Sequence, residues 1–133
     1  METKPALESK LVKEFVGVAH TDLARTKELL AQEPGMVNAT WDWGGGDFET
    51  ALGAAAHMGR RDIALYLLEH GARFDVFAAA MLGQLEAVQA ALSIHPALRN
   101  TRGAHGLTLL HHARQGGAEA QAVVEYFQRE GIQ

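Results

Sequence analysis

The chain of 133 residues contains no cysteine, which excludes disulfide bonds and any mechanism that depends on a thiolate. Serine is nearly absent as well: Ser9 and Ser93 are the only two, and neither lies in a Gly-x-Ser-x-Gly sequence. We therefore expect no covalent catalysis by cysteine or serine. No apolar run approaches the roughly 18 residues that a membrane-spanning helix needs. The first ten residues lack the apolar core of a signal peptide, so we expect a cytoplasmic protein.

Basic residues are too few and too scattered for a nucleic-acid-binding surface. The formal net charge is −4 at pH 7, and only Arg60-Arg61 and the pair Arg99 and Arg102 approach a cluster. Affinity for nucleic acid comes largely from neutralising phosphates with lysine and arginine. The sequence therefore predicts neither a nucleic acid nor a membrane as partner.

Apolar residues recur at helical spacing along most of the chain, which predicts a single, mainly α-helical domain over residues 1–133. In the first such segment, Leu7, Leu11, Phe15 and Val18 share one helix face. Further helices are expected where polar caps, glycine or proline bound an apolar pattern. The predicted helices are 6–20, 23–32, 50–58, 62–70, 78–82, 84–93, 107–115 and 118–129.

One unit of this pattern is repeated. Thr108-Leu-Leu-His-His-Ala113, followed by Gly117, has the spacing of Thr50-Ala-Leu-Gly-Ala-Ala55, followed by Gly59. Gly83 and Gly117 are separated by about the 33 residues of an ankyrin period. Over residues 12–131 the chain resembles the ankyrin-repeat family, with its Thr-Pro-Leu-His-x-Ala signature. The resemblance implies an all-α solenoid of about four helix-turn-helix repeats, joined by β-turn fingers.

Two of the expected fingers depart from the family in opposite directions. Residues 36–49 form an enlarged finger that carries two tryptophans, three acids and three successive glycines. Only 24 residues separate Gly59 from Gly83, which leaves no room for a finger at 73–77. We expect the inner helix after this missing finger to be uncovered on the concave side.

The resemblance also implies which side chains face the concave groove, since the two positions before each turn glycine and the fingers usually do so. His20 matches such a position in the first repeat, and His105 lies in the last finger. An apolar lining with a few polar groups is typical of a ligand site. The candidate ligand-binding residues are Trp41, Trp43, Asp47, Glu49, His57, Met58, Met81 and Leu82.

The family favours a binding module that recognises a segment of a partner protein through this groove. The alternative is a small-molecule-binding protein or a cofactor-independent acid–base enzyme, acting in isomerisation, hydration or cyclisation, with a pocket between the enlarged finger and the inner helices. Its candidate catalytic residues are Asp42, Asp47, Glu49 and His57, because paired carboxylates near a histidine can exchange protons. A third interpretation is an oligomerising unit that uses the apolar face of the last helix.

Each of these residues also has a structural interpretation. Trp41 and Trp43 can pack under the finger, and Asp47 or Glu49 can cap the helix that starts at Thr50. His111 matches the structural histidine of the family signature, and His112 falls where a buried residue is usual. No HExxH motif or closely spaced ligand set is present, so the sequence predicts no metal and no cofactor.

Overall fold

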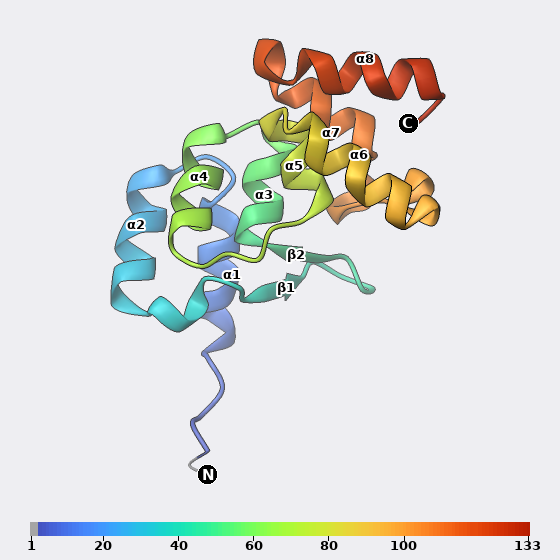
Figure 1. Ribbon diagram of the computed structural model, residues 1–133. Helices are drawn as coiled ribbons and strands as arrows, with labels where there is room; N and C mark the ends of the chain where they lie inside the picture. The colour runs from blue at the N-terminus through green and yellow to red at the C-terminus, as the bar shows by residue number, and fades with distance from the viewer. Residues whose placement is uncertain (1–2) are drawn as a thin grey trace.

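The computed structural model describes residues 3–133, and this part of the chain is mainly α-helical (Figure 1). Eight α-helices lie within it: α1 Ser9–Val18, α2 Leu23–Gln32, α3 Ala51–His57, α4 Arg61–Glu69, α5 Val76–Leu82, α6 Leu85–Ile94, α7 Leu109–Gln115 and α8 Gln121–Glu130. Consecutive helices pack as pairs, α1 with α2, α3 with α4, α5 with α6 and α7 with α8. The prediction of a mainly helical fold is confirmed.

The first helices of the pairs stack in a row, because α3 packs against α1 and α5, and α5 packs against α7. Three of them begin at a side-chain cap. Thr50, Asp75 and Thr108 each accept a hydrogen bond from the backbone N–H three residues further on. Such a cap satisfies a backbone donor that the helix itself leaves free. Thr50 therefore caps α3, and the expectation that Asp47 or Glu49 does so is wrong.

The core consists of two clusters of buried apolar side chains. One, around Phe15, Leu29 and Leu67, lies among the first four helices and reaches α5. The other, around Leu109 and Phe127, lies among α5 to α8. The first cluster also contains Met81 and Leu82, which are only 1% and 3% exposed. These two residues face the core and not a groove, so their assignment to the ligand-binding surface is wrong.

Gly83 ends α5 and allows the next helix pair to approach closely. It has a φ of +77°, and a Cβ at this position would lie 2.0 Å from the carbonyl oxygen of Glu119. Any larger residue would force the backbone of η4, the 3₁₀ helix Gly117–Ala120, to move. The glycine predicted to make this turn is therefore also required for packing.

A β-hairpin projects from the helices on the side opposite α2 (Figure 1). Its strands, β1 Thr40–Asp42 and β2 Phe48–Thr50, are antiparallel, with Trp41 opposite Glu49. The turn contains three glycines with positive φ, and the Asp42 carboxylate accepts hydrogen bonds from the N–H groups of Gly44 and Gly46. The enlarged finger predicted at 36–49 is this hairpin, preceded by the 3₁₀ helix η1 Pro34–Met36.

No strand forms between α4 and α5 in the described chain, where the missing finger was predicted. Residue Asp75 caps α5, which therefore starts at Val76, two residues earlier than expected. The last connection contains two more 3₁₀ helices, η2 Pro96–Asn100 and η3 Ala104–Gly106. None of the helices within residues 3–133 has both the length and the apolar character to cross a membrane.

Candidate functional site

Glu49 is the centre of a polar cluster that we call the histidine–glutamate cluster: His20, Glu49, His57 and His105. Glu49 lies on β2 and is 2% exposed, which is unusual for a carboxylate. The indole N–H of Trp43 donates a hydrogen bond of 2.8 Å to Glu49 Oε1. This hydrogen bond crosses the hairpin and holds the carboxylate on the face that covers α1 and α3.

Three histidines from different parts of the chain surround this carboxylate. His57 Nε2, at the end of α3, lies 2.9 Å from Glu49 Oε2, and His20 Nε2, just after α1, lies 3.2 Å from Oε1. His105 Nε2, in the loop before α7, lies 3.5 Å from Oε2. One ring nitrogen from each histidine and one oxygen of Glu49 all lie within 4.8 Å of one another.

Two of the histidines are oriented through their other ring nitrogen. His20 Nδ1 lies 2.9 Å from the carbonyl oxygen of Gly17 and 3.1 Å from that of Val16. His105 Nδ1 lies 2.6 Å from Asp47 Oδ2, and the backbone N–H of His105 donates to Asp47 Oδ1 at 2.7 Å. His105 has a φ of +59°, which is uncommon for a residue other than glycine. Asp47 thus fixes both the backbone and the ring of His105.

The cluster keeps Glu49 ionised. Burial by itself raises the pKa of Glu49, but the contacts with His20, His57 and Trp43 outweigh burial and bring the pKa down to about 2. The same contact with Glu49 raises the pKa of His20, against the opposing effect of burial. The two hydrogen bonds from His105, first that of its backbone N–H, lower the pKa of Asp47.

These pKa shifts weaken the case for acid–base catalysis. Such catalysis by two carboxylates needs environments that push their pKa values apart, so that one stays protonated. Here the pKa values of Asp47 and Glu49 are both lowered, and Asp42 is engaged in the hairpin turn. The candidate catalytic residues Asp47, Glu49 and His57 do come together, but without a protonated carboxyl group.

The remaining predicted ligand residues lie at the edges of this site or outside it. Trp43 is 37% exposed and combines an accessible ring with its hydrogen bond to Glu49. Trp41 is half-buried on the same hairpin face as Glu49, its cross-strand partner. Met58 follows His57 but is exposed and makes no part of the cluster.

His20 and His105 were not among the predicted ligand-binding residues. Both were recognised at groove or finger positions, but sequence separation hides their proximity to Glu49. Gly103 and Gly106, close to His105 in the sequence, are the one local signal of an unusual backbone there.

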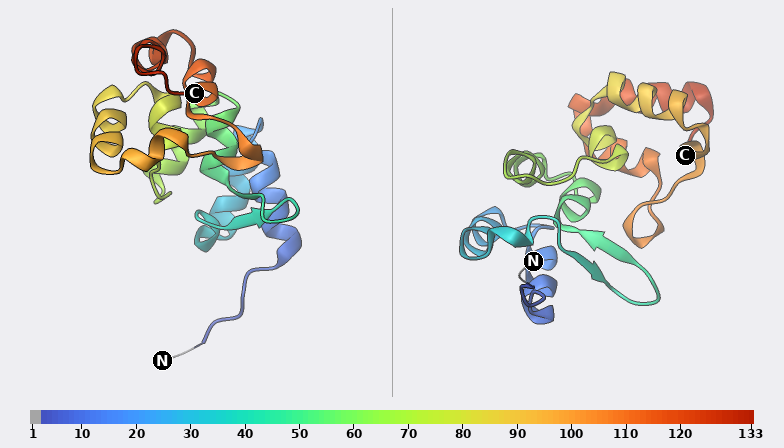
Figure 2. Two further views of the ribbon diagram at one scale, coloured as in Figure 1. Left: turned by 90° about the vertical axis from the view of Figure 1, so that its right-hand side faces the viewer. Right: turned by 60° about the horizontal axis from the view of Figure 1, so that its bottom comes forward.

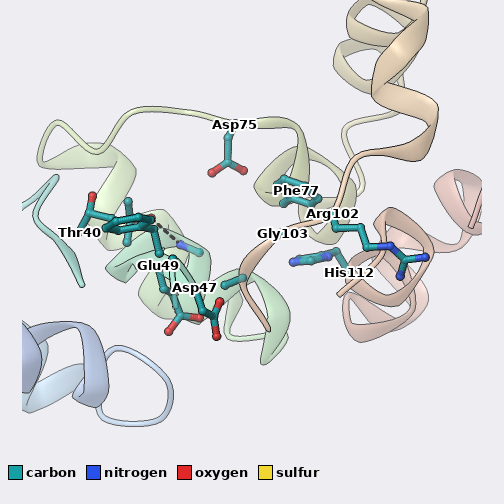
Figure 3. Close-up of a pocket in the computed structure, with 13 residues that line it drawn as sticks. Thr40, Asp47, Glu49, Asp75, Phe77, Arg102, Gly103 and His112 are labelled. Carbon is teal, nitrogen blue, oxygen red and sulfur yellow. Dashed lines mark hydrogen bonds between the residues drawn. The ribbon is translucent and has the colours of Figure 1, made fainter. Parts of the chain in front are cut away.

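A cavity of about 340 Å³ lies beside the hairpin, and Asp47 and Glu49 are among the residues that line it (Figure 3). Its walls come from β2, from the start of α5, from the loop before α7 and from His112. Phe48 and Phe77 supply apolar surface, and Asp75 and Arg102 supply opposite charges. Figure 3 shows Asp75 and Phe77 across this space from Thr40 and Glu49, while the Arg102 side chain extends away from the hairpin.

The cavity lies where the connection before α5 lacks a finger. The hairpin precedes α3, and a second narrow loop, closed by the bridge between Arg102 and Thr108, precedes α7. Since α5 lies between α3 and α7, a finger before α5 would fall between these two. The right-hand view of Figure 2 shows the hairpin and the loop before α7 extending in neighbouring positions.

A comparison with known protein families agrees with one helix pair, α3 with α4. No curated protein matches the chain significantly. The family model for the ankyrin repeat matches residues 47–79, which contain β2, α3, α4 and the first turn of α5. Ankyrin repeats are modules of protein interaction, built from stacked units with an extended binding surface. The match over residues 47–79 supports an ankyrin-repeat protein.

Proposed function

We propose that the chain is a single ankyrin-repeat domain of four helix pairs, 1–133, which binds an extended segment of a partner protein in the gap between the hairpin and the loop before α7. The cavity at the position of the absent finger is the observation that carries this proposal. The partner segment takes the place of that finger and covers the start of α5.

The free edge of β2 supports binding of an extended segment. Trp43 N–H donates to the carbonyl oxygen of Asp47, so these two residues form a hydrogen-bonded pair. In an antiparallel pair such positions alternate with non-hydrogen-bonded ones, which places the N–H and C=O of Phe48 on the outer edge. An added strand would satisfy these groups, as in other cases of recognition by strand addition.

The side chains around the gap favour a segment with one apolar anchor. Phe48 is 62% exposed, although it is large and apolar, and Phe77 faces the same cavity. An apolar side chain of the partner between these rings would remove both from water. Arg102 at the rim would favour a neighbouring acidic residue in the partner segment.

A peptide library displayed on phage tests the proposal with the intact chain as bait. We expect the enriched peptides to share an apolar residue, and to shift the amide NMR signals of Phe48, Phe77 and Gly103. Phe48→Ser should abolish binding of these peptides. Phe74→Ser is the matched control, because Phe74 is also exposed, at 49%, but does not line the cavity.

Two results would contradict this function. One is the absence of any enriched peptide. The other is enrichment of peptides that bind the Phe48→Ser variant as well as the unaltered chain, since these would occupy another surface.

A further inference from the structure

We propose that the histidine–glutamate cluster is a binding site for a divalent transition-metal ion, of which Zn²⁺ is the best match. His20, His57 and His105 would supply their Nε2 atoms and Glu49 a carboxylate oxygen. Glu49 and its neighbour Asp47 also line the cavity proposed for the partner segment, but the metal site is argued from other contacts and does not depend on that function.

The first reason is an unmatched pair of polar atoms at the centre of the cluster. His57 is 8% exposed and Glu49 is 2% exposed. His57 Nε2 and Glu49 Oε2 lie 2.9 Å apart, but within the described chain neither atom has a partner with hydrogen-bond geometry. Buried polar atoms are almost always satisfied, so an unsatisfied pair at such a distance indicates a missing ligand.

The second reason is the position of the ring protons. The carbonyl groups of Val16 and Gly17 can only accept, so His20 carries a proton on Nδ1. In the neutral ring, its Nε2 then presents a lone pair to the Glu49 carboxylate, and Asp47 imposes the same arrangement on His105. Lone pairs that face a carboxylate repel it, so either a second proton on each ring or a cation must lie between them, and a single divalent cation serves all the rings at once.

The third reason is that the supporting contacts are those of metal-binding histidines. Such histidines usually donate their second ring N–H to a carboxylate or a backbone carbonyl, which fixes the ring and its tautomer. Asp47 provides this contact for His105, and Gly17 provides it for His20. With a divalent ion, the charges of Glu49 and Asp47 would be balanced.

The distances suit a small ion. Bonds of about 2.0–2.1 Å in a tetrahedral site place neighbouring ligand atoms about 3.3 Å apart. The Nε2 atoms of His57 and His105 lie 2.9 and 3.5 Å from Glu49 Oε2, and that of His20 lies 3.2 Å from Oε1. One ligand atom from each of the four residues lies within 4.8 Å of the others. Three imidazoles and one carboxylate suit Zn²⁺ and related ions, while Ca²⁺ and Mg²⁺ prefer sites made of oxygen.

The sequence argument against a metal depended on ligand spacing along the chain. It failed to identify this cluster because the four ligands come from four separate segments: the end of α1, strand β2, the end of α3 and the loop before α7.

Titration of the metal-free protein with Co²⁺ tests the site directly. We expect one Co²⁺ per chain, visible ligand-field absorption, displacement by Zn²⁺, and a higher Tm in the presence of Zn²⁺. His105→Asn should weaken binding at least about tenfold. Asparagine tolerates the positive φ at this exposed loop position, so the variant should fold. His95→Asn, at an exposed histidine outside the cluster, should bind normally.

Glu49→Gln provides a second variant of similar shape, which keeps an oxygen for Trp43 but removes the charge. Circular dichroism would confirm that both variants fold. The proposal would be overturned if the unaltered chain bound no stoichiometric Co²⁺. It would also be overturned if His105→Asn and Glu49→Gln both bound Co²⁺ as tightly as the unaltered chain. Phe48→Ser should leave metal binding unchanged, which separates this site from the proposed peptide site.

Discussion

At the residue scale, His112 is a buried histidine that, unlike His57, has a hydrogen-bond partner and lies outside the histidine–glutamate cluster. It is 1% exposed, its Nδ1 lies 2.6 Å from the Thr108 carbonyl oxygen, and its ring lies 4.8 Å from that of Phe77. Burial lowers the pKa of His112 to about 4, and the hydrogen bond to Thr108 opposes this effect only in part. The sequence interpretation of a satisfied, buried histidine agrees with this geometry.

This lowered pKa predicts a dependence of stability on pH. The folded chain resists protonation of His112. The contribution of His112 to the free energy of unfolding is therefore fully present above the unfolded pKa of about 6.5. It is lost as the pH falls from there through about 4, at a rate of at most about 1.4 kcal/mol per pH unit. The groups that act on His112 are His111, His57 and Glu49. For His112→Gln, the free energy of unfolding measured in urea should depend less on pH over this interval than it does for the unaltered chain. An unchanged pH dependence would mean that other groups cause the loss of stability.

The sequence allowed candidate site residues to be identified, but not how these residues are arranged in space. Asp47, Glu49 and His57 were identified as candidate site residues, and they do lie together. Whether Glu49 faces the helices or the solvent depends on the register of the hairpin, which places Trp41 opposite it. The turn conformation of three glycines determines that register, and no periodicity in the sequence reports it.

At the element scale, helices were predicted best where polar caps and glycine bound them. The helix expected at 23–32 is found as α2, with Asp22 as its cap. The one expected at 118–129 begins only at Gln121, because Gly117–Ala120 forms a 3₁₀ helix instead. Short 3₁₀ helices lack a distinct apolar period, so the sequence pattern merged this one with the helix that follows.

The turn between α5 and α6 supports a prediction about packing between elements. Gly83→Ala should destabilise the fold by at least about 2 kcal/mol, because it adds overpacking to an unfavourable φ. Gly117→Ala is the control: its φ is also positive, at +64°, but a Cβ there would meet nothing within 4 Å. Its cost should be about 1–2 kcal/mol from the backbone alone. Guanidinium unfolding measures the loss of stability in both variants. Equal losses would mean that η4 shifts at no cost to accommodate the alanine of Gly83→Ala.

At the scale of the whole molecule, Asp47 and His105 join the hairpin to the loop before α7 across 58 positions of sequence. In Asp47→Asn, the charge that pairs with the His105 ring is removed, and the positive φ of His105 loses its support. We expect faster hydrogen exchange at 102–106 and at the hairpin tip, with no change in α2. Mass spectrometry of exchanged peptides would detect this difference. Uniform acceleration along the chain would instead indicate general destabilisation.

The histidine–glutamate cluster takes His20 from the first helix pair, Glu49 and His57 from β2 and α3, and His105 from the loop before α7. The pair of α5 with α6 lies between His57 and His105 in the chain. In an ordinary repeat array each unit contacts only its neighbours. Such an array can therefore be lengthened or shortened in evolution by duplication or deletion of a unit. An extra unit between His20 and His105 would carry His105 away from Glu49. The cluster therefore requires a fixed number of repeat units between its members. A unit could be added without separating them only before His20 or after His105.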